Sequence, residues 1–171
     1  ETKEALLIAI KDAFNYDSKI LIEQAIQGRE IELALLKDKN DLKVSQAGEI
    51  KITSNDDFYS YQAKYKSNNL AQLIYPAPLS SSQLMALQKA AKLTFESLEC
   101  EGLARVDFFL EKDTDKIILN EVNTLPGFTK ISMFPKLWHI SGIEYSDLLN
   151  QLIEQAHWRY EENASLLRNY L

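Results

Sequence analysis

A chain of 171 residues that is 46% apolar and 26% charged has the size and composition of one domain with a single core. The formal net charge of −6, without a cluster rich in Lys and Arg, argues against nucleic acid or an anionic membrane as the main partner. No apolar run is long enough to cross a bilayer. The single cysteine, Cys100, excludes an internal disulfide and fits a reducing compartment, and a zinc site is not expected from two histidines.

The first half of the chain predicts a helix followed by short strands. Thr2 can cap a helix whose apolar residues recur at helical spacing as far as Phe14. Two strands are then expected at 19–26 and 30–36, and a third at 48–52. Residues 53–78 are polar, lack regular periodicity and contain two prolines near their end, which indicates a functional loop or a locally disordered segment.

The second half predicts helices around a pair of strands. Ser80 and Gln83 have the spacing of a capping box, which marks the start of a helix. Strands are expected at 103–110 and 116–123, and a short helix from Pro135. A long final helix carries an apolar stripe formed by Leu148, Leu152, Ala156 and Tyr160. Helices and strands do not alternate strictly, so the expected class is α+β, an antiparallel sheet flanked by helices without an internal domain boundary.

Polar side chains recur at every second residue of the two late strands. Arg105 and Asp107 share one face of the first strand, and Glu121 and Asn123 share one face of the second. An antiparallel pair closed by the short turn between them places Asp107 opposite Glu121 and Arg105 opposite Asn123. We therefore expect these four side chains to lie in one patch.

The same register brings Leu110 opposite Ile118, so the apolar side of the strand pair agrees with it. Two carboxylates that face each other are unfavourable unless positive charge lies between them, and Mg²⁺ accepts carboxylate and amide oxygens. The guanidinium of Arg105 suits a phosphate or an oxyanion. The alternative is a solvated strand face on which Arg105 and Glu121 form an ion pair of little consequence.

These motifs resemble the signature of the D-alanine–D-alanine ligases within the ATP-grasp superfamily. The resemblance rests on Gly-Leu-Ala-Arg-Val-Asp at 102–107, Asn-Glu-Val-Asn-Thr-Leu-Pro-Gly-Phe-Thr at 120–129 and Ile-Ser-Met-Phe-Pro-Lys-Leu-Trp at 131–138. It covers the whole chain and is specific as a combination, whereas Glu-x-Asn alone is shared by many ATP-grasp enzymes. It implies that residues 1–171 are the C-terminal part of an ATP-grasp catalytic domain, without the N-terminal domain and the phosphate loop.

The resemblance also implies roles for the residues of the late strands. Asp107, Glu121 and Asn123 would be the ligands of Mg²⁺ or Mn²⁺. Arg105 and the backbone N–H of Gly127 would stabilise the oxyanion of a tetrahedral intermediate.

The same resemblance implies substrate-binding roles for two further segments. Ser132 and the backbone of Met133 would hold the carboxylate of the second D-alanine, and the alternative for Ser132 is a hydroxyl that caps a helix. Phe-Tyr-Ser-Tyr-Gln-Ala-Lys-Tyr at 58–65 resembles the family's mobile loop. Lys64 in this loop would contact the phosphates, and Tyr65 would close over the first D-alanine. The alternative for Lys64 is an exposed loop lysine.

The resemblance implies an ATP-binding role for the early strands. The segment 20–26 is similar to the strand that contacts adenine, with Glu23 and the backbone at Ala25 and Ile26 facing the base. Glu30 would take the ribose hydroxyls. The alternative is a pair of strands with an exposed carboxylate.

The implied activity is the ATP-dependent ligation of two D-alanines to D-alanyl-D-alanine for peptidoglycan synthesis, in the cytoplasm. ATP would phosphorylate the carboxylate of one D-alanine, and the amine of the second would attack the acyl phosphate and release phosphate. ATP and Mg²⁺ or Mn²⁺ are the expected cofactors. The full-length enzyme, with its N-terminal half, is expected to be a homodimer, and the 171 residues alone are expected to be inactive.

Two other functions are compatible with the sequence. The first is that of another ATP-grasp carboxylate–amine ligase with a different acceptor. The second is that of a non-catalytic binding domain that keeps the fold. The intact set of Arg105, Asp107, Glu121 and Asn123 counts against the second function, because decayed enzymes tend to lose buried charges.

Overall fold

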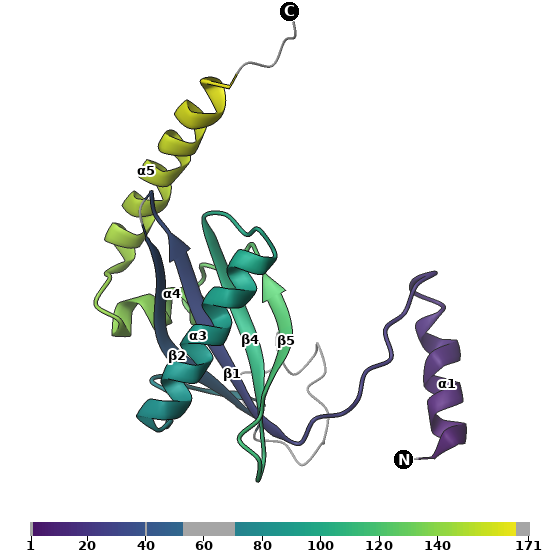
Figure 1. Ribbon diagram of the computed structural model, residues 1–171. Coiled ribbons are helices and arrows are strands. Elements are labelled where there is room, and N and C mark those ends of the chain that lie inside the picture. Colours follow the sequence, from purple (N-terminus) through teal and green to yellow (C-terminus); the bar gives the residue numbers. More distant parts are fainter. Residues whose placement is uncertain (1, 40, 53–70, 167–171) are drawn as a thin grey trace, which may run out of the picture.

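The computed structural model describes residues 2–39, 41–52 and 71–166. In these residues five strands form one antiparallel sheet in the order β3-β2-β1-β4-β5, which confirms the predicted α+β class. The strands are β1 (Gly28–Lys37), β2 (Leu42–Ile52), β3 (Ala71–Ile74), β4 (Leu103–Glu111) and β5 (Ile117–Asn123). The helices are α1 (Lys3–Ala13), α3 (Ser81–Ser97), α4 (Met133–Ile140) and α5 (Tyr145–Ala164). Helix α3 crosses one face of the sheet and α4 lies on the other (Figure 1).

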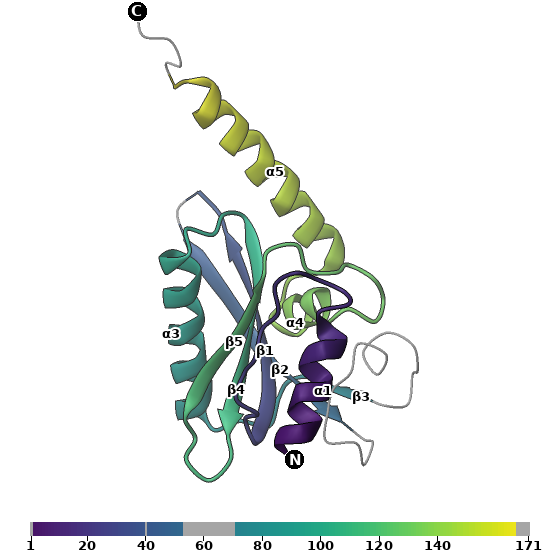
Figure 2. The same cartoon turned by 90° about the vertical axis from the view of Figure 1, so that its right-hand side faces the viewer.

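The sheet separates two apolar layers. On the α3 side, residues two apart on β1 and β4 point toward the helix, which begins with the predicted capping box at Ser80. The buried residues of this layer are Ile31, Leu33, Leu35, Ala47, Leu87, Ala91, Phe95, Ala104, Val106, Phe108 and Leu110. The buried residues on the α4 side are Ala34, Leu36, Ile50, Met133, Phe134, Leu137, Trp138 and Leu148. Figure 2 shows α3, the sheet and α4 in this order.

A β-bulge interrupts the pairing of β1 with β2. The register shifts between Leu33, which pairs with Ala47, and Leu35, which pairs with Val44. Ser45 closes the bulge: its buried Oγ accepts a hydrogen bond from the N–H of Ala34 at 2.9 Å and donates one to the carbonyl of Gln46, the next residue of β2. The extra residue lets both Val44 and Ala47 pack in the α3-side layer although they lie three residues apart.

The connection between α1 and β1 corrects one prediction. Thr2 caps α1 as expected, but the segment 19–26 is not a strand. A strand needs a hydrogen-bonded neighbour, and the strand order leaves this segment without one in the described part of the chain. Its apolar side chains Leu21 and Ile22 are accordingly exposed. Helix α1 and this connection extend away from the sheet (Figure 1), and no residue of α1 is buried.

Other element bounds differ from the sequence prediction. Strand β2 begins six residues before the predicted 48–52, and β3 lies within the predicted loop. Helix α4 begins at Met133, two residues before Pro135. The stripe on α5 is buried only at its start, because the helix then leaves the domain (Figure 1) and Tyr160 is 74% exposed. None of the helices in the described residues combines the length and apolar character needed to span a bilayer.

Replacing Ser45 with alanine tests the bulge. The S45A change removes the acceptor of the buried N–H of Ala34, so we expect a loss of about 1–3 kcal/mol in the free energy of unfolding. Ser165→Ala is the matched control, because the Ser165 hydroxyl donates to the carbonyl of Glu162 on an exposed turn, and a change below about 0.5 kcal/mol is expected. Urea unfolding measures both variants, and equal losses would contradict the structural role of Ser45.

Candidate active site

Six polar side chains extend from three neighbouring strands on the α4 side of the sheet. Cross-strand pairing places Glu32 opposite Asp107, Asp107 opposite Glu121, and Arg105 opposite Asn123. We call this surface the acidic face; its residues are Glu30, Glu32, Arg105, Asp107, Glu121 and Asn123. The predicted pairings of Asp107 with Glu121 and of Arg105 with Asn123 are confirmed.

A second bulge corrects the predicted register of the same strand pair. Leu110 pairs with Ile117 and not with Ile118, because the register shifts by one between Asp107 and Phe108. The extra residue on β5 is Asn120, since the partners of Asp107 and Phe108 are Glu121 and Leu119. The shift keeps Glu121 on the acidic face while Ile117 and Val122, five residues apart, both pack against the α3-side layer.

Arg105 is held by three carboxylates on the acidic face. Its Nε and Nη2 donate to Oδ1 and Oδ2 of Asp107 at 2.8 and 2.7 Å, which makes a bidentate pair. Its Nε also lies 3.3 Å from Oε1 of Glu32. Oε1 of Glu121 is more distant, 3.8 Å from Nη2. The strong pair is therefore the one with Asp107, on the same strand.

Three charged side chains of this face are almost completely buried. Asp107 is 0% exposed, Glu32 1% and Arg105 8%. Burial alone would lower the pKa of Arg105, but hydrogen bonds to Asp107 and the charges of the nearby carboxylates outweigh this effect and raise that pKa above its ordinary value. The guanidinium consequently stays charged although it is buried.

The donor set fits a hard divalent cation. Carboxylate oxygens of Glu30, Glu32 and Asp107 lie within 4.8 Å of one another. With Glu121, four carboxylates face one guanidinium on these strands, an excess of three negative charges when all are ionised. Oxygen ligands of this kind are those that Mg²⁺ and Mn²⁺ prefer. Of the predicted ligands, Asp107 belongs to this carboxylate group, and Glu121 and Asn123 lie on the same face.

The Pro-Gly loop after β5 brings Gly127 close to Ser132. A Cβ at Gly127 would lie 2.7 Å from Oγ of Ser132, so the close approach requires glycine. Asn123 starts the loop, and its Oδ1 accepts a hydrogen bond from the N–H of Leu125 at 3.2 Å. A carbonyl oxygen has two lone pairs, so this bond leaves Asn123 able to contact another ligand.

Ser132 precedes α4 without capping it. Its Oγ accepts from the N–H of Thr129 at 3.1 Å and lies 2.8 Å from the Thr129 hydroxyl, and its side chain makes no cap hydrogen bond. The alternative role of a helix-cap hydroxyl is therefore wrong. Met133, the first residue of α4, is buried over Gly48, where a Cβ would lie 2.7 Å from its sulfur. Gly48 pairs with Glu32, so the start of α4 lies beside the acidic face.

Of the residues predicted to contact ATP that the structure describes, only Glu30 lies on the acidic face. Glu30 lies with the carboxylates of the acidic face. Glu23 and Ala25 are exposed in the extended connection before β1, and Ile26 is half-buried there (Figure 1). The structure thus places them outside a strand, unlike the prediction. Lys64 and Tyr65 lie outside the described residues.

Glu32 was missed by the sequence prediction. The spacing of two between Glu30 and Glu32 is the signal that would have placed both on one strand face, as it did for Arg105 and Asp107. The spacing alone does not show that Glu32 belongs to the site; the pairing of β1 with β4 does, because it brings Glu32 opposite Asp107.

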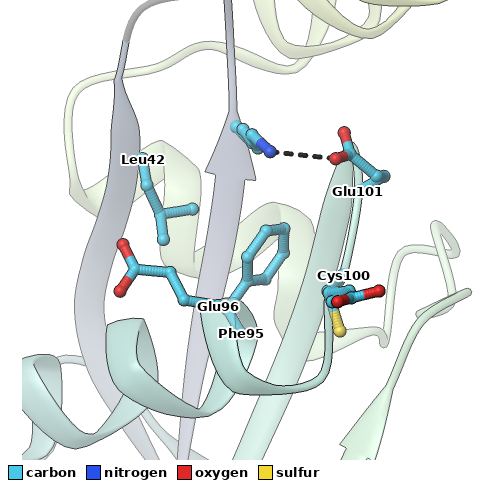
Figure 3. Close-up of a pocket in the computed structure, with 7 residues that line it drawn as sticks. Leu42, Phe95, Glu96, Cys100 and Glu101 are labelled. Atoms are coloured by element: carbon cyan, nitrogen blue, oxygen red, sulfur yellow. Dashed lines mark hydrogen bonds and ion pairs between the residues drawn. The ribbon is translucent and has the colours of Figure 1, made fainter.

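A separate hollow of about 530 Å³ lies on the α3 side of the sheet (Figure 3). It is lined by Lys37, Leu42, Phe95, Glu96, Glu99, Cys100 and Glu101. Lys37 and Glu101 form a salt bridge of 2.9 Å at its edge. No residue of the acidic face lines this hollow, so it is not part of the predicted site.

Comparison with known proteins agrees with this geometry. A family model described as "D-ala D-ala ligase C-terminus" matches residues 1–154. The chain belongs to this ligase family. A D-alanine–D-alanine ligase of Legionella pneumophila (strain Lens) is 47% identical over 171 residues, covering 98% of this chain and 47% of that protein. One from Shouchella clausii is 51% identical over 166 residues, covering 96% and 44%. The chain thus spans less than half the length of these curated relatives.

Solved structures show the same fold. The D-alanine–D-alanine ligase from Coxiella burnetii matches with a TM-score of 0.82 and 38% identity, covering 98% of this chain and 43% of that one. The VanG D-Ala:D-Ser ligase from Enterococcus faecalis matches with a TM-score of 0.78 and 31% identity, covering 90% and 43%. The predicted D-alanine–D-alanine ligase family is confirmed by these findings and by the family model.

Removing the guanidinium tests the charge balance of the acidic face. Arg105→Met leaves Glu32 and Asp107 buried without their arginine, so we expect a loss of about 3–5 kcal/mol in the free energy of unfolding, partly restored by Mg²⁺. Arg29→Met is the matched control, because Arg29 pairs with Glu49 on the opposite face and is 33% exposed, and a loss of about 1 kcal/mol is expected. Chemical unfolding with and without Mg²⁺ measures both, and a loss in R105M no larger than in R29M would contradict the role of Arg105.

Proposed function

We propose that this chain forms the C-terminal half of an ATP-dependent D-alanine–D-alanine ligase, which makes D-alanyl-D-alanine for peptidoglycan synthesis. The observation that carries the proposal is the acidic face, where Arg105 and Asp107 are buried in a bidentate pair beside Glu32. Buried charges of this kind are costly for stability alone, which favours a functional reason for them. The names of relatives that share between 45% and 51% identity support the substrate.

The proposed cofactors are ATP and Mg²⁺ or Mn²⁺, with Asp107, Glu121 and Asn123 as cation ligands. The cation would neutralise the charge of the phosphoryl group in transfer. Asp107 offers a carboxylate fixed by β4, and Glu121 is exposed enough to turn toward a ligand. Arg105 would donate from its planar fork to a phosphate or to the developing oxyanion, together with the N–H of Gly127.

Glu30 is the proposed contact of the ribose hydroxyls. Its carboxylate lies near those of Glu32 and Asp107, so ribose bound at Glu30 would lie close to the proposed cation site. Glu23 and the backbone at Ala25 and Ile26 remain the proposed adenine contacts. Lys64 and Tyr65 are likewise proposed to cover the phosphates and the first D-alanine.

The start of α4 is proposed to bind the carboxylate of the second D-alanine. The backbone N–H groups of the first helical turn carry partial positive charge, and the Ser132 side chain does not cap them. Oγ of Ser132 and the backbone of Met133 would complete this anion site. Gly127 is exposed and close to Ser132, which supports its proposed place beside this site.

We infer that the reaction also needs parts of the enzyme outside this chain. These are the N-terminal domain, which would bind the first D-alanine, and the phosphate loop. The use of ATP favours the cytoplasm as the place of action, and the full-length enzyme is proposed to be a homodimer.

A different acceptor is the second candidate function. It is favoured by the likeness to VanG, which is named as a D-Ala:D-Ser ligase and shares 31% identity with this chain. The fold of this half therefore does not decide the acceptor on its own. A non-catalytic binding domain is disfavoured by the buried pair of Arg105 and Asp107.

Asp107→Asn in the full-length enzyme tests the proposed function. Loss of the fixed carboxylate should lower kcat by about 100-fold or more, because the transferring phosphoryl group loses its charge neutralisation. Asp113→Asn is the matched control on the exposed turn between β4 and β5, where Asn also tolerates the φ of 68°. Phosphate release from ATP is measured with D-alanine, D-serine and D-lactate as acceptors. Equal kcat in D107N and wild type would contradict the cation role, and preference for D-serine or D-lactate would contradict the proposed product.

The isolated 171-residue chain provides a second test. We expect no release of phosphate above background from ATP and D-alanine, because the first-substrate domain and the phosphate loop are not in this chain. The full-length enzyme is the positive control in the same coupled assay. Turnover by the isolated chain would contradict the proposal that the reaction needs the N-terminal domain and the phosphate loop.

A further inference from the structure

Arg105 has two buried acidic partners on its Nε. That nitrogen donates its one hydrogen to Oδ1 of Asp107 at 2.8 Å, and Oε1 of Glu32 lies 3.3 Å from the same nitrogen. The second contact to Asp107, from Nη2 at 2.7 Å, makes Asp107 the preferred partner. Glu32 is consequently a second partner that is already in place.

The guanidinium and a cation would compete for the same carboxylate. Both oxygens of Asp107 accept hydrogen bonds from Arg105. A divalent cation bound to Asp107 would also stand within a few ångströms of the guanidinium and repel it. Like charges a few ångströms apart repel each other strongly near a protein surface, where water screens them only in part, and a doubly charged ion increases this repulsion. Arg105 therefore has to loosen its hold on Asp107 when the cation binds.

A buried guanidinium that loosens one pair needs another negative partner. Glu32 meets this need, because β1 holds it opposite Asp107 and it is 1% exposed. On its other side Glu32 faces Gly48, which has no side chain and lies under Met133. The carboxylate is thus screened from water by protein on that side, and its attraction for Arg105 is stronger than at the surface.

We propose that Glu32 is a positioning residue, which keeps the guanidinium of Arg105 on the acidic face when Asp107 turns from it to a divalent cation. This inference rests on the proposed function, because it takes the cation site from there. Glu32 acts through Arg105 and is not itself a ligand of the cation. When Glu32 carries no charge, Arg105 stays bound to Asp107 and competes with the cation.

A double-mutant cycle of Mn²⁺ affinity tests this role in the full-length protein. Titration calorimetry compares wild type, Glu32→Gln, Arg105→Met and the double variant. We expect E32Q to weaken Mn²⁺ binding about tenfold when Arg105 is present and less than twofold when it is Met, since the effect passes through Arg105. Equal weakening in both backgrounds would overturn the proposal and show that Glu32 acts on the cation directly. No change in either background would overturn it as well.

Two further variants control for charge and folding. Glu49→Gln makes the same chemical change in a carboxylate paired with Arg29 on the opposite face of the sheet, and it should leave Mn²⁺ affinity unchanged. If E32Q does not fold, as judged by thermal unfolding, the cycle is run with Glu32→Asp, whose shorter side chain keeps the charge but draws back from Nε. The effect of E32D should likewise disappear when Arg105 is Met, and a persisting effect would overturn the proposal.

Ligase turnover by the wild type separates this inference from the proposed function. A non-additive Mn²⁺ cycle without phosphate release that depends on D-alanine would support the positioning role and contradict the proposed ligase. Normal turnover with an additive cycle would overturn the positioning role alone.

Discussion

Two carboxylates, those of Glu32 and Asp107, are buried on a sheet face where Arg105 contributes the positive charge beside them. Charges taken out of water must be paired and hydrogen-bonded, so the positions of all three side chains are interdependent. The neighbouring strands β1 and β4 hold the three side chains on one face of the sheet. The apolar layer under α3 holds the same strands from behind, and it leaves the acidic face free to bind ligands.

Sequence patterns predicted the strand pair β4–β5 and the site on it, because a short turn fixes the partner and residues two apart share a face. The pairing of Asp107 with Glu121 followed from these two facts alone. The role of Glu32 did not, because β1 and β4 are far apart in the chain and nothing local selects one as the neighbour of the other. When a site combines strands that are not consecutive in the chain, its residues can be identified only once the strand order is known.

The mistakes in the predicted elements have physical causes as well. The segment 19–26 has the alternation of a strand, but the described sheet offers no backbone partner for it. Strand β2 was recognised only in its second half, because the bulge at Ser45 places Val44 and Ala47 on one face and breaks the period of two. Alternation in sequence detects regular strands, and it fails where an extra residue changes the phase.

The extra residue on β5 has a consequence for how this sheet can vary. Asn120 is exposed, so its side chain is open to exchange for many others. Its backbone, by contrast, sets the phase between Ile117 on one side of it and Val122 on the other. Shortening the chain by this one residue would force a choice between turning Val122 toward solvent and aiming Glu121 away from Asp107. Substitution of the Asn120 side chain should therefore disturb this sheet much less than deletion of the residue.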